Sequence, residues 1–155
     1  MRLLYLVSHP IQYQAPLLRL IADAPNIELR VLFEDKKSSV AYFDSGFERE
    51  ITWSTNLIDG YENQQVSKLS EIRSYLSETD VFWLHGWNTY LKLKALNLAW
   101  QSNIPVLMRG ENTLSAMPDG EMLRGFIKRS YLGWIFRRCS VFLYIGSDNR
   151  EYYSF

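Results

Sequence analysis

Four short apolar runs, each followed at once by a small polar cluster, constrain the fold of this chain most. They are Leu3–Val7 before Ser8-His9-Pro10, Val81–Leu84 before His85-Gly86-Trp87, Val106–Met108 before Arg109-Gly110-Glu111-Asn112, and Val141–Ile145 before Gly146-Ser147-Asp148. Runs this short and apolar are typical of strands buried in a parallel sheet. In such a sheet all four clusters would lie at the carboxyl edge, where open α/β sheets bind ligands.

The segments between these runs have helical patterns. We expect helices over Ala15–Ala22, from a cap at Ser67 to about Ser77, from a cap at Asn88 onward, and over Glu121–Arg138. Strands that alternate with helices predict an α/β fold. The expected architecture is a Rossmann-like, doubly wound, mainly parallel sheet with helices on both faces.

Two other segments alternate apolar and polar residues. Ile27–Phe33 is expected to be a strand with one wetter face, near an edge of the sheet, and Phe47–Trp53 alternates in the same way. Lys36–Gly46 is polar and without period, which predicts a loop. Asp59-Gly60 is a turn signal.

Composition limits the class of protein. The 155 residues suit a single domain over 1–155, and a net charge of zero argues against nucleic acid as a partner. The sequence has no apolar run of membrane-spanning length and no signal peptide, and its sole cysteine, Cys139, suits a reducing compartment, so we expect a cytoplasmic protein.

A capping-box pattern at Asp148 and Glu151 lies close to the end of the sequence, so we expect a piece of a longer protein.

The loop after the first run offers side-chain donors and acceptors. His9, Gln12, Tyr13 and Gln14 precede the first helix, and no glycine lies among them, so close wrapping around a pyrophosphate is not expected. These side chains suit a hydroxyl-rich ligand. The alternative is that His9 and Gln12 only satisfy backbone groups of the loop.

The second cluster holds a histidine at a strand end. With an ordinary pKa near 6.5, His85 could act as acid, base or hydrogen-bond donor. Gly86 would let a ligand approach the backbone, and Trp87 could stack on a sugar face. The alternatives are a structural histidine and a tryptophan that packs in the core.

The third cluster places opposite charges around a glycine. Arg109 could hold a phosphate or carboxylate, and Glu111 could accept hydrogen bonds from hydroxyls, with Asn112 beside them. The alternative is an ion pair between Arg109 and Glu111 that only stabilises the loop. In the fourth cluster, we interpret Asp148 as a helix cap.

Other chemistries lack support in the sequence. No metal-ligand spacing surrounds either histidine, so we expect no metal site, and no serine-hydrolase elbow or flanked cysteine nucleophile occurs. The stretch Glu121–Arg138 is basic and aromatic, which suggests a membrane surface. Its basic residues scatter around the helical wheel, however, and this favours a solvated, partly buried helix.

Five segments form one combination: Ser8–Leu17, Gly46–Trp53, Leu57–Tyr61, His85–Trp87 and Arg109–Thr113. Together they resemble the N-terminal half of group 1, or family 4-like, glycosyltransferases. The resemblance covers nearly the whole chain.

The resemblance implies a GT-B architecture, in which two Rossmann-like domains face each other across a cleft. It implies a retaining hexosyltransferase of carbohydrate biosynthesis that needs no metal. A separate C-terminal domain, the partner of this one, would hold the nucleotide-sugar donor, and this domain would bind no cofactor and shape the site for a sugar or glycan acceptor. His85 resembles the histidine near the donor sugar, which makes it the catalytic candidate. The family's E-x7-E pair does not occur here, so we expect the fragment alone to be inactive.

Two other classes stay open. One is a non-catalytic, flavodoxin- or receiver-like α/β binding domain, although a receiver would need acidic residues where Ser8 and His9 follow the first run. The other is a membrane-surface module that binds through Glu121–Arg138.

Overall fold

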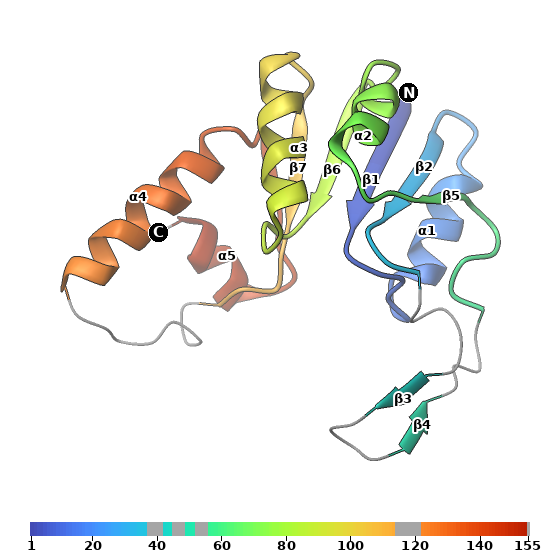
Figure 1. Ribbon diagram of the computed structural model, residues 1–155, viewed down its shortest axis with the longest axis horizontal. Helices are drawn as coiled ribbons and strands as arrows, with labels where there is room; N and C mark the ends of the chain where they lie inside the picture. Colours follow the sequence, from blue (N-terminus) through green and yellow to red (C-terminus); the bar gives the residue numbers. More distant parts are fainter. Residues whose placement is uncertain (37–41, 45–48, 52–55, 114–121, 155) are drawn as a thin grey trace.

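The computed structural model describes residues 1–36, 42–44, 49–51, 56–113 and 122–154. It confirms the α/β fold: one six-stranded sheet, parallel at every strand pair, is flanked by helices (Figure 1). The sheet strands are β1 (Arg2–Val7), β2 (Glu28–Phe33), β5 (Glu62–Gln65), β6 (Val81–His85), β7 (Val106–Arg109) and β8 (Val141–Leu143). The helices are α1 (Ala15–Ala22), α2 (Leu69–Leu76), α3 (Tyr90–Gln101), α4 (Met122–Phe136) and α5 (Ser147–Ser154). Strands β3 (Tyr42–Asp44) and β4 (Arg49–Ile51) pair antiparallel in a separate two-stranded sheet.

The strand order across the sheet is β5-β2-β1-β6-β7-β8. Numbered along the chain within this sheet, that is 3-2-1-4-5-6, the order of the Rossmann fold. Flavodoxin-like sheets have the order 2-1-3-4-5, so the flavodoxin- or receiver-like sheet of the alternative is not formed. The order reverses between β1 and β6, and ligands of such sheets bind at this switch point.

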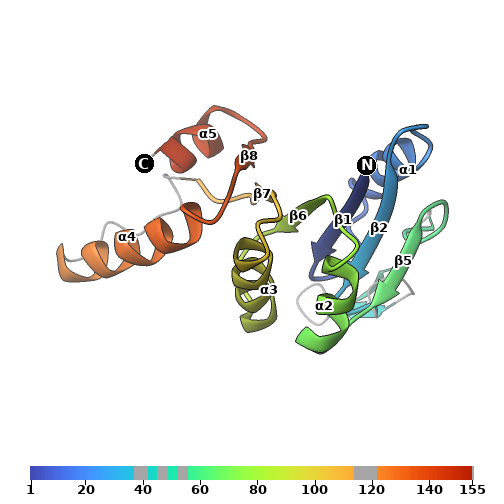
Figure 2. The same cartoon turned by 90° about the horizontal axis from the view of Figure 1, so that it is seen from above.

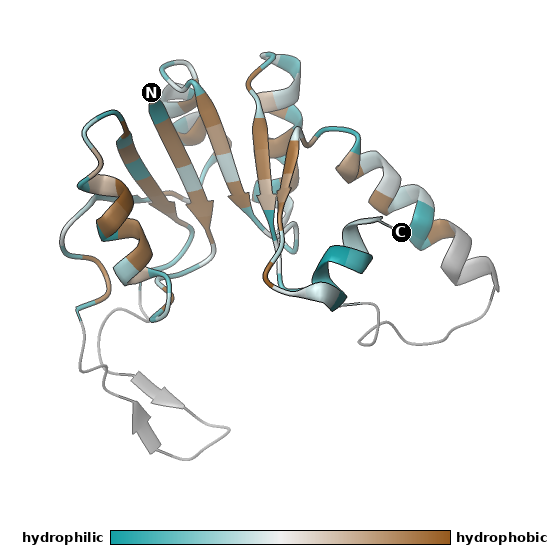
Figure 3. Ribbon diagram, turned by 180° about the vertical axis from the view of Figure 1, so that it is seen from behind, coloured by the Kyte–Doolittle hydropathy of each residue, from teal (hydrophilic) through white to brown (hydrophobic). Residues whose placement is uncertain are grey.

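The side chains of β1 alternate between the two faces of the sheet, and both faces are buried. Leu3, Tyr5 and Val7 pack with α1, whereas Leu4 and Leu6 pack with α2 and α3 on the opposite side (Figure 2). Brown, hydrophobic stretches make up much of the central strands, with paler bands between them (Figure 3). A fully buried leucine stabilises a fold by about 1.5–3 kcal/mol, so β1 anchors both halves of the core.

Two predicted helix caps are displaced by one residue. The residue before α2 is Lys68 and not Ser67, and the side chain of Glu71 accepts hydrogen bonds from the backbone N–H groups of both. The cap of α3 is Thr89 and not Asn88, since the Thr89 hydroxyl accepts from the backbone N–H of Lys92 at 3.3 Å.

Other local predictions also need correction. Helix α5 begins at Ser147, so Asp148 lies in its first turn and not at the cap. Strand β5 was not predicted, because Glu62–Gln65 is wholly polar; it forms at the sheet edge by pairing with the backbone of β2. The segment Lys36–Gly46, expected to be a loop, contains β3. Of the alternating segment Phe47–Trp53, only β4 lies within the described residues.

Candidate functional site

A cleft of about 520 Å³ lies at the carboxyl edge of the sheet, at the switch point between β1 and β6. The loops after β1, β6 and β7 supply its walls. Seven predicted residues line it: His9, Tyr13, His85, Gly86, Trp87, Glu111 and Asn112. Three predicted residues do not line it: Gln12, Gln14 and Arg109. The fourth polar cluster, Gly146–Asp148, is also outside it.

Tyr5, Gln14 and His85 form a triangle of close polar contacts below the cleft. Nε2 of Gln14 lies 2.9 Å from Nδ1 of His85, and the hydroxyl of Tyr5 lies 2.8 Å from the same nitrogen. The Tyr5 hydroxyl also donates to Oε1 of Gln14. Tyr5 and Gln14 are completely or almost completely buried, so this support is preorganised.

Burial, together with the charges of Arg109, Lys92 and His9, lowers the pKa of His85 to about 4, and burial is the largest of these causes. The imidazole is therefore neutral at neutral pH. The ordinary pKa near 6.5 that the sequence suggests for His85 is therefore not its pKa in the fold. A neutral imidazole can still donate or accept one hydrogen bond at Nε2.

The two glutamines of the first loop are not ligand-facing. Gln14 is only 1% exposed, and its amide contacts Tyr5 and His85. Gln12 is exposed but does not line the cleft. The sequence placed both correctly in the loop; the turn Gln14 makes into α1 decides which way its side chain points.

A buried lysine at the base of the cleft was not predicted. Lys92 of α3 is 1% exposed, and its Nζ donates to the Ser8 hydroxyl at 2.6 Å and to Asn88 Oδ1 at 3.0 Å. The carboxylate of Glu34 lies 3.7 Å away and accepts a 2.6 Å hydrogen bond from Thr89. Lys92 thus joins the loops after β1 and β6. In the sequence, only the position of Lys92 between apolar residues of a helix could have indicated its burial. That signal is weak, because lysines usually lie on the solvated face of a helix.

Gly86 and Trp87 shape the wall of the cleft. Gly86 has φ +71°, a conformation that favours glycine, and its N–H donates to the Arg109 carbonyl at 2.7 Å. The backbone N–H is thus already satisfied. Trp87 stacks on Tyr152, with ring centroids 6.2 Å apart, and meets Phe136 edge-on. Trp87 therefore packs in the core while one edge lines the cleft.

The ion pair between Arg109 and Glu111, given above as the alternative to a ligand-binding role, does not form. Among the described residues Arg109 has no ion pair, and its buried Nε has no hydrogen-bond partner there. Glu111 instead accepts a hydrogen bond from the Tyr13 hydroxyl, across the cleft from the loop after β1. Arg109 is opposite His85 in the β6–β7 register, so its charge acts on the imidazole.

Helix α5 holds the loop after β7 in place. Nδ2 of Asn149 donates to the Asn112 carbonyl at 2.6 Å, and Asn149 Oδ1 accepts from the Ile145 N–H at 3.1 Å. Asn149 is 2% exposed. The Tyr153 hydroxyl donates to the Gly110 carbonyl at 3.4 Å. The third wall of the cleft thus depends on a helix about forty residues later in the chain.

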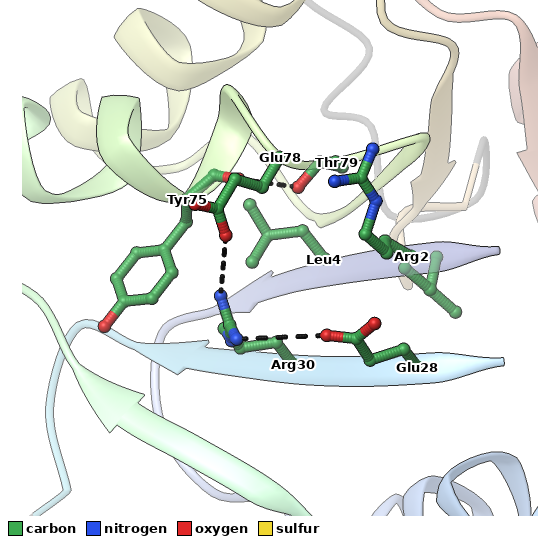
Figure 4. Close-up of a pocket in the computed structure, with 8 residues that line it drawn as sticks. Arg2, Leu4, Glu28, Arg30, Tyr75, Glu78 and Thr79 are labelled. Atoms are coloured by element: carbon green, nitrogen blue, oxygen red, sulfur yellow. Dashed lines mark hydrogen bonds and ion pairs between the residues drawn. The ribbon is translucent and has the colours of Figure 1, made fainter.

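A second cavity, of only about 20 Å³, lies near the amino-terminal ends of β1 and β2 (Figure 4). Arg30 at its wall is 2.7 Å from Glu62, 3.8 Å from Glu78 and 5.2 Å from the centre of the Tyr75 ring. The space suits about one water molecule, and the charge of Arg30 is already paired. This cavity is therefore not a ligand site.

The described residues contain neither a candidate metal site nor a candidate membrane span. No group of three or more His, Cys, Asp or Glu residues there could hold a metal ion. None of the helices in that part of the chain has the length and apolar character needed to cross a bilayer.

Comparison with known proteins adds no family. The sequence matches no family model, and no curated protein matches it significantly. The function is therefore inferred from the site.

Proposed function

We propose that this chain is the acceptor-side domain of a retaining, nucleotide-sugar-dependent glycosyltransferase of GT-B architecture. One observation carries the proposal: a neutral histidine, supported from below by Tyr5 and Gln14, lines a polar cleft at the switch point of a Rossmann-ordered sheet. In the proposed enzyme a separate domain holds the nucleotide-sugar donor. A cytoplasmic location belongs to the same proposal.

The groups around the cleft support a hydroxyl-rich ligand. Glu111 offers a carboxylate acceptor, and Asn112, Ser8 and His9 offer groups that donate or accept. The positive charge of Lys92 is compensated by Glu34, which lies within 3.7 Å. Because that cation is compensated, the cleft suits sugar hydroxyls better than a diphosphate.

His85 would act as a neutral donor. The Nε2 atom of His85 has no hydrogen-bond partner among the described residues. The residue itself lines the cleft. In the proposed reaction it donates to a hydroxyl of the donor sugar, while Glu111 and Asn112 orient the acceptor. Positioning and preorganised dipoles supply the rate in such a site.

The test is a transfer assay with the full gene product, UDP- and GDP-linked hexoses, and a panel of neutral mono- and disaccharide acceptors. We expect transfer with retention, and a loss of at least tenfold in turnover for His85→Ala. Gln101→Ala, on the exposed end of α3, is the matched control and should leave turnover unchanged. Wild-type turnover in His85→Ala would remove His85 from the mechanism.

Titration of the domain alone with sugars, together with the transfer assay, distinguishes a non-catalytic binding domain from a glycosyltransferase. We expect neutral disaccharides to shift the amide resonances of Gly86, Glu111 and Asn112. Binding without any transfer by the full gene product would favour the binding domain, and neither binding nor transfer would overturn the glycosyltransferase proposal.

A further inference from the structure

We infer that Gln14 is a positioning residue that fixes the proton of His85 on Nε2, the nitrogen left for a ligand, with Tyr5 holding the amide of Gln14 in the required orientation. The inference deepens the proposed function, because it states what the catalytic candidate presents to the sugar. Gln14 thereby takes a role different from the ligand contact expected from the sequence.

The hydrogen-bond inventory determines the tautomer. The amide nitrogen of Gln14 has no acceptor lone pair, so at 2.9 Å from Nδ1 of His85 it can only donate. Nδ1 must then be the acceptor, and in a neutral imidazole the single proton lies on Nε2. Protonation of Nδ1 would place two donors against each other.

The opposite orientation of the amide leaves a buried hydrogen unpaired. With Oε1 toward His85, Nδ1 would carry the proton, and Nε2 of Gln14 would face the Tyr5 hydroxyl as a donor. The hydroxyl hydrogen of Tyr5 would then have no acceptor among the described residues of the triangle. Tyr5 has no exposed surface, and an unpaired buried polar group costs about 1–3 kcal/mol. In the orientation that the structure has, the Tyr5 hydroxyl donates to Oε1 of Gln14 and Nε2 of Gln14 donates to Nδ1 of His85, so the buried hydroxyl hydrogen keeps its acceptor.

The groups around His85 come from four elements, and three of them carry the charges that act on its ring. Arg109 lies on β7, Lys92 on α3 and His9 in the loop after β1, and each disfavours a proton on the ring. Tyr5 of β1 faces Nδ1 as a neutral phenol, because burial raises its pKa. A carboxylate in place of the Gln14 amide would be the one negative group in direct contact with Nδ1.

The test is nitrogen NMR of the imidazole rings, which needs no ligand. The chain has two histidines, so His9→Gln assigns the signals of His85. We expect a pyridine-type shift at Nδ1 and a pyrrole-type shift at Nε2. In Gln14→Glu the proton should move to Nδ1, and the titration midpoint should rise by about one to three pH units, as for an opposite charge in contact. Gln12→Glu adds the same charge to the same loop outside the cleft, and should leave the tautomer unchanged.

A pyrrole-type Nδ1 in the wild-type protein would overturn the inference, even if Gln14→Glu does not fold. So would an unchanged tautomer in a folded Gln14→Glu. Either result would leave the transfer assay of the proposed function untouched, whereas a failed transfer assay would not alter the tautomer.

Discussion

The ammonium group of Lys92 donates a 2.6 Å hydrogen bond to the hydroxyl of Ser8, a residue 84 positions earlier in the chain. This contact joins α3 to the end of β1 across the switch point of the sheet. The carboxylate of Glu34, just after β2, balances the positive charge of Lys92. One buried ion pair thus connects three segments that form the base of the cleft.

Replacing Lys92 by methionine should destabilise the domain strongly, because Glu34 would be left as an unpaired, mostly buried carboxylate. Removing one partner of a buried ion pair costs about 3–5 kcal/mol of folding free energy. Urea denaturation of the variant and the wild-type protein measures this loss. The double variant Lys92→Met with Glu34→Gln should recover much of this loss. Glu62→Gln, in the more exposed pair with Arg30, is the control and should have a much smaller effect. A Lys92→Met protein as stable as Glu62→Gln would show that the pair is not structural.

Alanine should lower the stability of the domain at Gly86 and raise it at Gly133. At Gly86 a Cβ would lie 3.7 Å from Asn88 Oδ1, so the loss comes from the φ of +71° and not from a clash; we expect about 1–2 kcal/mol. Gly133 lies inside α4 with open space at its Cβ, so alanine should stabilise by up to about 1 kcal/mol. Denaturant midpoints of the two variants give the comparison. A neutral Gly86→Ala would contradict the backbone argument.

The stability of the domain should rise with pH between about 4 and 6.5 through His85. Its pKa is lowered to about 4 in the fold and returns to about 6.5 on unfolding, so the unfolded state binds more protons in this window. Well below pH 4 His85 is protonated in both the folded and the unfolded state, and the loss of folding free energy is then complete, on the order of 3 kcal/mol. Urea denaturation across the window should show this slope in the wild-type protein and not in His85→Gln. His9→Gln should keep it; a slope that survives in His85→Gln belongs to other groups.

Asn149→Ala should loosen the third wall of the cleft. The variant leaves the Asn112 carbonyl and the Ile145 N–H without their partner, and each lost buried hydrogen bond costs about 1–3 kcal/mol. We expect lower stability in urea and changed amide resonances at Gly110, Glu111 and Asn112. Glu151→Ala, exposed on the same helix, is the control. Unchanged resonances in the loop would show that α5 does not hold it.

The strands and helices were predictable where the chain buries its apolar groups. Helix α1 has the predicted bounds, because Ala15–Ala22 has core residues at helical spacing, and β1 contains the whole predicted apolar run Leu3–Val7. β5 was missed because its four residues are polar; only the backbone of β2 makes it a strand. The caps at Ser67 and Asn88 were one residue early, since neighbouring polar residues are equally suitable until the helix position is set.

The amino-acid pattern alone predicts that polar residues gather at one edge of a parallel sheet, because short apolar runs separated by helical crossovers leave little choice of architecture. The tertiary structure alone decided what each polar residue does there. His85 became neutral, Gln14 turned inward and Lys92 was buried, since these outcomes depend on burial and on partners 71 to 84 positions away. Local patterns carry no information about such contacts, and the energies of buried polar groups are set by them.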